Sequence, residues 1–482
     1  MFEALATYMG MGWIYYVLVV IYALTVVAIV IVIISENRNP VKSLAWVTVL
    51  LLLPFVGIVL YVFFGRNIKN KRMISRRNRR RLKKRELRHP RNILPEGFSE
   101  ESRQKIRLGR SLTGAPFHPG NDINIFISGA DKMAAFKDDL RNAQRSICMQ
   151  YYIFCDDNVG TEIRDILVDR ARAGVEVRVI YDHVGSWGTS SRFFKSLQEA
   201  GVKVYPFFKV TFPQLGTKIN WRNHRKICII DGAVGYIGGM NIADRYMDGG
   251  SRFDKWRDTH ARVKGPIIAS LLHSFAVDWN FMGQPLIDDI ADPAETCDKG
   301  DVGMQLLTSG PTSQWSDIEF IFQKAISSAK KRVYIQTPYF LPTDSLLKSL
   351  QAAALAHVDV RVMIPAHSDS SMLTYASESY ISECLRAGIK FYQYTAGMLH
   401  SKTILVDDEF STIGSSNFDF RSFEHNFEAN LFIYSHRVNE RMADIFRTDI
   451  HDCRRIMPAE WRSRPLMRKA MQSLLRLLSP IL

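Results

Sequence analysis

One pattern of eighteen residues occurs twice in this chain and decides the expected fold. The first copy, at residues 224–241, reads HRKICIIDGAVGYIGGMN, and the second, at residues 400–417, reads HSKTILVDDEFSTIGSSN. Both fit His-x-Lys, four residues, Asp, six residues, Gly, Gly or Ser, any residue, Asn. The copies begin 176 residues apart in a chain of 482 residues. Two matches to so constrained a pattern indicate that a whole functional unit is duplicated.

Each copy is predicted to form a strand, a turn and a second strand. Residues 227–230 and 403–406 are apolar and rich in β-branched side chains, and turn-forming residues follow each stretch. Side chains on a strand alternate between its two faces. His224 and Lys226 therefore share a face, whereas Asp231 lies an odd number of residues from His224 and points the other way. The same spacing separates the residues of the second copy, so the two motif aspartates are expected to hold the turns.

The residues around each motif histidine favour phosphate chemistry over metal chemistry. A lysine beside each histidine would repel a divalent cation but offers donors and a positive charge to a phosphate. The side chains of Asn241, Asn417 and Ser415 are candidates for binding the same phosphate. One neutral imidazole can attack phosphorus while the other, protonated, gives its proton to the leaving alkoxide. An ordinary histidine pKa of about 6.5 suits both tasks.

Each histidine also needs a carboxylate to orient it, and the motif aspartates face the wrong way. The better candidates come later in each half: Asp258 in Trp-Arg-Asp and Glu428 in Asn-Phe-Glu. Ordinary ion pairs are the alternative interpretation of both carboxylates. The sequence leaves open which carboxylate serves which histidine.

The duplicated pattern resembles the paired HKD motifs of the phospholipase D superfamily, over roughly residues 120–435. Asn417, Asp419, Arg421 and Ser422 form a run that is typical of the second motif of this superfamily. The chain resembles in particular the bacterial cardiolipin synthases, through the segments 39–65, 337–340 and 476–482. The resemblance implies two similar α/β halves around a pseudo-twofold axis, a phosphohistidine intermediate, no metal and no cofactor. The motif residues that it implies to be catalytic are His224, Lys226, Asp231, His400, Lys402 and Asp407.

The same resemblance implies a function. A cardiolipin synthase transfers a phosphatidyl group from one phosphatidylglycerol to another and releases glycerol. The alternatives are a membrane-bound hydrolase of the phospholipase D type, another phosphatidyltransferase, or a scaffold without activity. The resemblance favours His224 as the nucleophile, and the oligomeric state stays open.

The charge distribution points to a membrane rather than to nucleic acid. The chain has a formal net charge of +15, but residues 66–110 alone hold 18 basic and 4 acidic side chains. A nucleic-acid-binding protein would not concentrate its charge in one linker, so the expected partners are anionic phospholipids. The six cysteines are scattered without a Cys-x-x-Cys pair, which is typical of reduced thiols.

The N-terminal region is predicted to be a transmembrane hairpin. Trp13 to Ile34 and Ser43 to Gly65 are both free of charged residues and long enough to cross a bilayer. A cleavable signal peptide fits poorly, because the start lacks a basic segment and the apolar run is too long. The twelve basic residues within 66–85 place the body of the chain on the cytoplasmic side of the cell membrane and attract anionic lipid.

Four regions follow from these observations. We expect a transmembrane hairpin at 1–65, a basic juxtamembrane linker at 66–119, and two phospholipase D-like halves at 120–300 and 301–482. The tail after Trp461 alternates basic and apolar residues. It is expected to be an amphipathic helix, which either lies on the bilayer or packs on the enzyme.

Overall fold

The computed structural model of the protein describes residues 12–35, 40–53, 55–61, 73, 75–86, 97–210, 220–287, 300–477 and 479. The chain divides into two compact units. The N-terminal unit comprises Met1–Ile68 and Val210–Asn220, and the main unit comprises Lys69–Lys209 and Trp221–Leu482.

The N-terminal unit contains one long apolar helix, α2 (Gly12–Ser35). Its segment Trp13–Ile33 is, within the described residues, the one helix both long and apolar enough to cross a membrane. A shorter helix, α3 (Pro40–Leu52), packs against it, and the Tyr22 hydroxyl donates to the main-chain oxygen of Leu50 at 2.7 Å. The prediction of a long N-terminal apolar helix is confirmed.

The second predicted span is not one continuous helix. It divides into α3 and the short α4 (Val56–Leu60), and Phe55 between them has a φ of 62°. A positive φ takes the backbone out of the right-handed helical region. The thirteen residues of α3 extend about 20 Å, which is short of a hydrocarbon core of about 30 Å. The structure therefore shows one candidate span, where the sequence predicts two.

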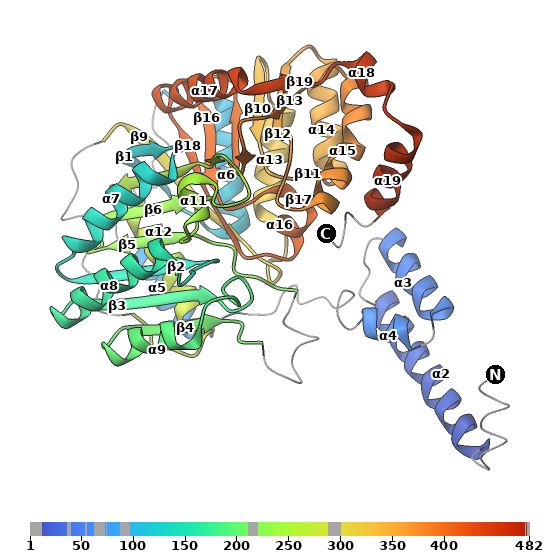
Figure 1. The fold of residues 1–482 in the computed structure, drawn as a ribbon, viewed down its shortest axis with the longest axis horizontal. Helices are drawn as coiled ribbons and strands as arrows, with labels where there is room; N and C mark the ends of the chain where they lie inside the picture. Colours follow the sequence, from blue (N-terminus) through green and yellow to red (C-terminus); the bar gives the residue numbers. More distant parts are fainter. Residues whose placement is uncertain are drawn as a thin grey trace. The chain divides into compact units, whose positions relative to one another are not determined.

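The main unit begins with two helices and then alternates strands and helices through the first half of the fold (Figure 1). The helices of this part are α5 (Arg76–Glu86), α6 (Glu100–Thr113), α7 (Gly129–Arg141), α8 (Asn158–Arg172), α9 (Ser191–Glu199), α11 (Arg245–Asp248) and α12 (Ile268–Phe281). The strands are β1 (Phe117–Phe126), β2 (Ser146–Tyr151), β3 (Glu176–Asp182), β4 (Lys203–Phe207), β5 (Ile227–Ile230), β6 (Val234–Gly238), β7 (Trp256–Arg257) and β8 (His260–Lys264).

The second half repeats this order and adds a C-terminal extension. Its strands are β9 (Val302–Ser309), β10 (Arg332–Gln336), β11 (Phe340–Leu341), β12 (Asp359–Pro365), β13 (Lys390–Tyr394), β14 (Met398–Leu399), β15 (Thr403–Val406), β16 (Phe410–Gly414), β17 (Phe418–Asp419), β18 (Glu428–Tyr434) and β19 (Cys453–Arg455). Its helices are α13 (Asp317–Ser327), α14 (Asp344–Leu355), α15 (Ser371–Arg386), α16 (Phe420–Glu424), α17 (His436–His451), α18 (Pro458–Arg462) and α19 (Leu466–Leu477).

One sheet of fifteen strands joins the two halves through the antiparallel pair of β1 and β9. Outwards from this pair the order is β8-β6-β5-β2-β3-β4 in the first half and β18-β16-β15-β10-β12-β13 in the second, where β19 forms the edge. Each strand that the first half contributes to this sheet thus has a counterpart in the second, whereas β19, α18 and α19 belong to the C-terminal extension. The prediction of an α/β fold with two similar domains is confirmed.

Helices cover both faces of this sheet. On one face, α12 and α17 share a core with alternate strand residues such as Ile229. On the opposite face, α7, α8 and α9 pack on the first half together with Cys228 and Ile230, and α13, α14 and α15 pack on the second half. Neighbouring residues of β5 thus enter different cores, as strand alternation requires.

The predicted basic linker is partly folded into the main unit. Helix α5 contains much of the basic run, and its Leu82 is buried in the core that holds α12. Helix α6 begins at the N-cap Ser99 and packs on the second half, where Ile106 is buried. Its Ser102 hydroxyl donates to the Glu409 carboxylate at 2.5 Å. The stretch expected to be a plain connector therefore contributes a helix to the core.

Candidate active site

Both motif copies form the predicted hairpins. Strand β5 pairs with β6 and β15 with β16, both antiparallel. Each motif aspartate sits in the turn with a positive φ, 54° at Asp231 and 52° at Asp407. The Asp231 carboxylate accepts hydrogen bonds from the main-chain nitrogens of residues 144, 145 and 146 at 2.7–2.9 Å. Asp407 accepts from the nitrogens of residues 330, 331 and 332 at 2.7–3.1 Å.

The motif aspartates are therefore structural and lie outside the histidine site. Their carboxylates tie each hairpin turn to the start of the neighbouring strand, β2 or β10. The length of β5 or β15, about 13 Å at four residues, separates them from the lysine of the same motif. The turn-holding role expected from strand alternation agrees with this geometry, and a catalytic role of Asp231 and Asp407 stays a prediction.

The two halves meet where the strand that leads into each motif crosses the other half. Strand β14, just before His400, pairs in parallel with β7, and the His400 nitrogen donates to the Arg257 oxygen at 2.7 Å. In the other half, the His224 nitrogen donates to the Phe427 oxygen at 2.9 Å. These main-chain bonds set each histidine beside the carboxylate-bearing segment of the opposite half.

The result is a crosswise pairing of histidines and carboxylates. His400 Nδ1 lies 2.6 Å from Asp258 Oδ2, and His224 Nδ1 lies 3.0 and 3.1 Å from the two oxygens of Glu428. An ionised carboxylate can only accept, so Nδ1 of each imidazole carries the proton. Nε2 is then the basic nitrogen of both rings and the atom available to attack a substrate.

The two motif lysines are buried beside these histidines. Lys226 Nζ donates to the His224 main-chain oxygen at 2.6 Å, and Lys402 Nζ donates to the His400 oxygen while lying 2.8 Å from His400 Nδ1. The charge of Lys402 also acts on His224, and that of Asp258 acts on Lys226. The residues of both motifs therefore face one common site.

Burial sets the charge state of this site. It lowers the pKa of both imidazoles to about 4, against the opposing pull of Glu428 on His224, and at His400 the charge of Lys402 adds to the effect. Burial also lowers the pKa of Lys402 to about 8. Burial alone would raise the pKa values of both carboxyl groups, but Lys402 and His400 outweigh it at Asp258, and His224 and Lys226 outweigh it at Glu428. At pH 7 both carboxylates are charged and both imidazoles are neutral.

The charge state differs from the one expected from ordinary histidines. With a pKa near 6.5, one imidazole would be protonated in a large share of the free protein. The structure leaves both imidazoles neutral, because their burial and the nearby ammonium groups outweigh the carboxylates. A proton for a leaving group must then be taken up from the solvent when the substrate binds.

The three predicted phosphate ligands have different surroundings. Asn241 is used internally: its Oδ1 accepts from the Ile153 nitrogen at 3.1 Å and its Nδ2 donates to the Tyr246 hydroxyl at 2.5 Å. Ser415 donates to the Glu428 carboxylate and so belongs to the support of His224. Asn417 keeps a buried Oδ1 without a partner among the described residues. Of the three, Asn417 has an unpartnered Oδ1, which can accept from a substrate hydroxyl, whereas a phosphate oxygen would need the amide nitrogen of the same side chain.

Two buried arginines that the sequence analysis missed anchor the crossing points. Arg225, the middle residue of the first motif, pairs with Asp278 of α12 at 2.7 Å and donates to the Glu428 main-chain oxygen at 3.1 Å. Arg257, next to Asp258, pairs with Asp449 of α17 at 2.7 Å. Both arginines are sequence neighbours of predicted site residues, which could have indicated their importance. Their partners lie on α12 and α17, far away in the sequence, and only the structure identifies them.

Aromatic rings line the approach to the histidines and were also missed. The Tyr152 ring lies edge-on to His224 with centroids 4.9 Å apart, and Trp256 lies 5.1 Å from His400. Such rings exclude water from the imidazoles and help to keep them neutral.

Comparisons with known proteins agree with this architecture. A family model described as "Cardiolipin synthase, PLD-like domain" matches residues 136–279 and 322–450, and one described as "Phospholipase_D-nuclease N-terminal" matches residues 23–66. The fold is similar to the crystal structure of phosphatidylserine synthase from Haemophilus influenzae, with a TM-score of 0.59 and 14% identity over 78% of this chain and 99% of that chain. Two such halves around one histidine–lysine site define a phospholipase D-like protein with two domains.

Full-length relatives narrow this class. The chain is 39% identical to the cardiolipin synthase of Halalkalibacterium halodurans, over 98% of this chain and 95% of the relative. It is 37% identical to the major cardiolipin synthase ClsA of Bacillus subtilis, over 96% and 98% of the two chains. The chain belongs to the cardiolipin synthase family, whose members are phosphatidyltransferases of the phospholipase D superfamily.

Proposed function

We propose that this protein joins two phosphatidylglycerol molecules into cardiolipin and releases glycerol. The observation that carries the proposal is the crosswise pairing, in which each motif histidine is held by a carboxylate of the other half. Both imidazoles present a basic Nε2 to one site beside two buried lysines, whose pKa values are lowered by burial and whose charged forms a phosphodiester anion would favour. Such a site offers one imidazole as the nucleophile and the other, once protonated in the complex, as the proton donor.

In the first half of the reaction, Nε2 of one histidine attacks the phosphorus of phosphatidylglycerol. The family resemblance assigns this attack to His224. A phosphorus–nitrogen bond forms and the bond from phosphorus to the glycerol oxygen breaks. His400, protonated at Nε2 in the complex, gives that proton to the leaving oxygen, so glycerol departs neutral and a phosphatidyl-histidine remains.

In the second half, a hydroxyl of another phosphatidylglycerol enters where glycerol left. The neutral His400 takes the proton of this hydroxyl while the hydroxyl oxygen attacks the phosphorus. The phosphorus–nitrogen bond breaks, cardiolipin forms and His224 is restored. The ionised Asp258 stabilises the imidazolium of His400 in both halves of the reaction.

In this scheme, substrate binding causes one histidine to take up a proton from the solvent. Both histidines are neutral in the free protein, because their pKa values are about 4. A phosphodiester anion between them favours the charged imidazolium and raises the histidine pKa. Lys226, Lys402 and the amide nitrogen of Asn417 are proposed to donate to the phosphate oxygens, and Ser415 to hold Glu428 in place. Asn241 is assigned instead to positioning the Ile153 main chain.

The membrane arrangement is part of the same proposal. Residues 1–65 form a hairpin of two passes, residues 66–119 a basic segment at the membrane, and residues 120–300 and 301–482 the two halves around a pseudo-twofold axis. The apolar helix α2 and the basic run of α5 support an anchored protein with its main unit in the cytoplasm. Protease digestion of an N-terminal tag in inverted membrane vesicles tests the second pass, since a single pass would leave the tag protected.

The proposed reaction is tested with purified full-length protein in detergent, supplied with phosphatidylglycerol and EDTA. Cardiolipin and free glycerol are measured together for the parent protein, His224→Ala and His400→Ala. We expect equal amounts of both products from the parent and a loss of about 10²–10⁴ in each variant. His436→Ala is the matched control, because this exposed histidine begins α17 and takes no part in the site.

Each other outcome has a definite meaning. Phosphatidic acid with glycerol but without cardiolipin would identify a hydrolase. Cardiolipin synthesis that persists in both histidine variants would exclude the two-histidine mechanism. Absence of turnover by the parent with this lipid would exclude phosphatidylglycerol as the donor.

A further inference from the structure

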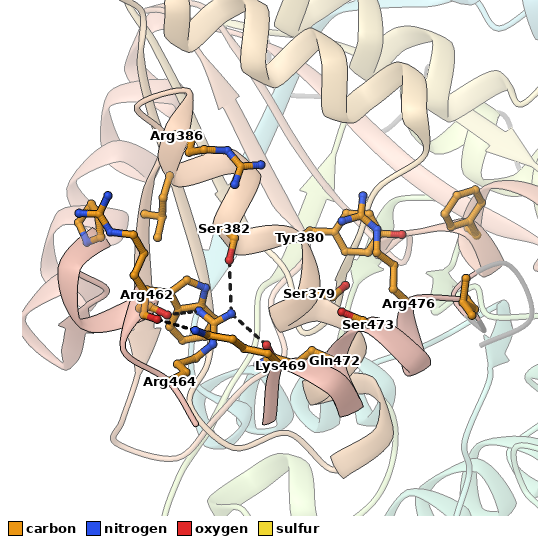
Figure 2. A pocket seen from close by; sticks show the side chains of 15 residues that line it. Ser379, Tyr380, Ser382, Arg386, Arg462, Arg464, Lys469, Gln472, Ser473 and Arg476 are labelled. Atoms are coloured by element: carbon orange, nitrogen blue, oxygen red, sulfur yellow. Dashed lines mark hydrogen bonds between the residues drawn. The ribbon is translucent and has the colours of Figure 1, made fainter. Parts of the chain in front are cut away.

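A second cavity lies at the C-terminal end of the main unit, between helices α15, α18 and α19 (Figure 2). Its volume is about 880 Å³, and none of the residues that line it belongs to the histidine site. Among the described residues around it, the lining contains five basic side chains and no carboxylate: Arg386, Arg462, Arg464, Lys469 and Arg476. The cavity therefore has the charge of an anion-binding site.

Several donors in this cavity lack a partner of opposite charge. In the part of the chain that the structure describes, neither Arg386 nor Arg462 forms an ion pair, whereas Arg476 pairs with Glu383. The Arg464 guanidinium stacks 3.8 Å from the Trp461 ring and donates to the Gln472 oxygen at 3.0 Å. Its buried Nε still has no hydrogen-bond partner among the described residues.

A further buried donor supports the presence of a ligand. The Trp461 side chain is only 6% exposed, yet its Nε1 is without a partner in the described structure. Buried donors are normally satisfied. An anion in the cavity could reach these two buried nitrogens only after a side-chain movement, whereas the guanidinium groups that line the cavity already offer donors to the several oxygens of a phosphate.

Helix α19, which forms one wall of the cavity, is turned with its polar residues inwards. Arg468 and Gln472 bond to the Glu378 carboxylate of α15, at 2.6 Å in both contacts. Most of its apolar residues face outwards, with Leu466 82% exposed, Met467 77% and Leu477 76%, whereas Leu475 is buried. A helix on a water-facing surface normally buries its apolar side chains.

The outward apolar face beside a basic cavity matches the interface of a lipid bilayer. There, apolar side chains enter the boundary of the acyl region and basic side chains meet the phosphates of anionic lipids. A soluble phosphate would use the basic cavity but would leave the apolar face uncovered. The chain also carries a helix long and apolar enough to cross a membrane, which supports a protein that is held at a bilayer.

We propose that this cavity binds the phosphate of an anionic phospholipid headgroup while the apolar face of α19 enters the same leaflet. The site is separate from the histidines and makes the C-terminal helix a second membrane contact of the enzyme. Both alternatives for the tail are then combined, because α19 packs on the enzyme through its polar side and on the bilayer through its apolar side.

Hydrogen–deuterium exchange tests the proposal on the full-length protein in lipid nanodiscs. All proteins carry His400→Ala, so that lipid turnover does not change the composition. Exchange of the amides of residues 466–477 is compared in nanodiscs of phosphatidylcholine alone, of phosphatidylcholine with phosphatidylglycerol, and of phosphatidylcholine with inorganic phosphate in the buffer. We expect protection of α19 only in the second case.

The double variant Arg386→Gln/Arg462→Gln separates the cavity from general charge. Each basic residue near an anionic surface contributes enough binding energy that loss of both should weaken the anionic-lipid-dependent protection about thirtyfold. Arg441→Gln is the matched control, because this exposed arginine of α17 lies outside the cavity and should leave the protection unchanged. Exchange of the α15 amides in the same spectra shows whether each variant is folded.

Three results would overturn the proposal. Equal exchange of α19 in both lipid mixtures would exclude an anionic-lipid site. Protection by inorganic phosphate alone would assign the cavity to a soluble anion. Undiminished protection in the folded double variant would show that α19 contacts the membrane without the cavity.

Discussion

The two halves of the fold cross at two points, and each crossing point places a motif histidine beside a carboxylate of the other half. The two points do so with different residues. At the first, His224 meets Glu428, and the buried guanidinium comes from the motif itself as Arg225. At the second, His400 meets Asp258, the motif offers Ser401, and the guanidinium comes from the opposite strand as Arg257. Each crossing point therefore contains one buried arginine, which belongs to the motif at the first point and to the opposite half at the second.

The helices complete this correspondence. Arg225 pairs with Asp278 of α12, and Arg257 pairs with Asp449 of α17, the counterpart of α12 in the second half. Where the first crossing point has Arg225 opposite Phe427, the second has Ser401 opposite Arg257. The arginine thus comes from the motif at one crossing point and from the opposite half at the other, and a neutral residue faces it each time. This arrangement keeps volume and charge balanced in a buried interface.

The carboxylates are supported unequally. Glu428 accepts from His224, Ser415 and Asn426, whereas Asp258 accepts from His400 and from the Thr259 nitrogen. The counterpart of Ser415 is Gly239, where a β-carbon would overlap the Asp258 carboxylate. The shorter aspartate thus lies close to the hairpin and excludes a side chain there, and the longer glutamate leaves room for a serine.

Loss of either carboxylate should cause the largest effect. Glu428→Gln and Asp258→Asn remove the charge that sets the histidine tautomer and stabilises the imidazolium, so turnover should fall by about 10²–10⁴. Cardiolipin formation by the purified variants measures this. Asp231→Asn is the control, since an amide oxygen can still accept from the nitrogens of residues 145 and 146 and only the bond from the Gln144 nitrogen is lost, so activity should fall far less. Full activity in either carboxylate variant would contradict the crosswise site.

Exchanging the cation at the first crossing point tests the comparison directly. Arg225→Ser leaves Asp278 buried and unpaired, which should cost about 3–5 kcal/mol and lower the thermal midpoint of the protein by on the order of 10 °C. Adding Phe427→Arg copies the arrangement of the second crossing point and should restore part of the loss. Thermal unfolding of both single variants and the double variant gives the coupling. A double variant no more stable than the worse single variant would show that the sides are not interchangeable.

The neutral histidines make binding depend on pH. Their pKa is about 4 in the free protein and is raised in the complex, so binding is linked to proton uptake, is strongest at low pH and weakens as the pH rises. We expect an unreactive phosphonate analogue of phosphatidylglycerol to bind with uptake of about one proton at pH 7, and its affinity to fall about tenfold per unit between about pH 5 and 8. Calorimetry in buffers of different ionisation enthalpy measures both quantities.

Lys402 adds a second pH effect and supplies the control. Its pKa is lowered to about 8, so it loses its positive charge as the pH rises through that value and the affinity should fall more steeply above it. Lys402→Arg should remove only this extra slope, because arginine stays charged. Binding without proton exchange at pH 7 would mean that one imidazole is already protonated in the free protein.

The smallest effect is expected from removing the extra support of Glu428. Ser415→Gly deletes one hydrogen bond to the carboxylate and makes the first crossing point resemble the second. The bond is worth about 0.5–1.5 kcal/mol, so turnover should fall about two- to tenfold. The rate of cardiolipin formation at saturating lipid measures it. A loss as large as that of Glu428→Gln would show that the serine acts on the substrate itself.

Much of the site was predictable from local sequence. Period-two alternation placed His224 with Lys226 and turned Asp231 away, because the direction of a side chain on a strand depends only on its neighbours. The apolar composition predicted α2 in the same way. The second span was less predictable from hydropathy, although Pro54 in the sequence just before Phe55 is a local signal for a kink at this place.

The sequence by itself determined the duplication, the two motif hairpins, the structural place of the motif aspartates and the candidate residues of the site. Tertiary structure decided which carboxylate serves which histidine, since the partners are 204 and 142 residues apart and meet only where the halves cross. It also decided the charge state, because the pKa of an imidazole follows from its burial and from charges brought in by distant strands. Local pattern determines which side chains share a face, and only the packing of the two halves determines what that face meets.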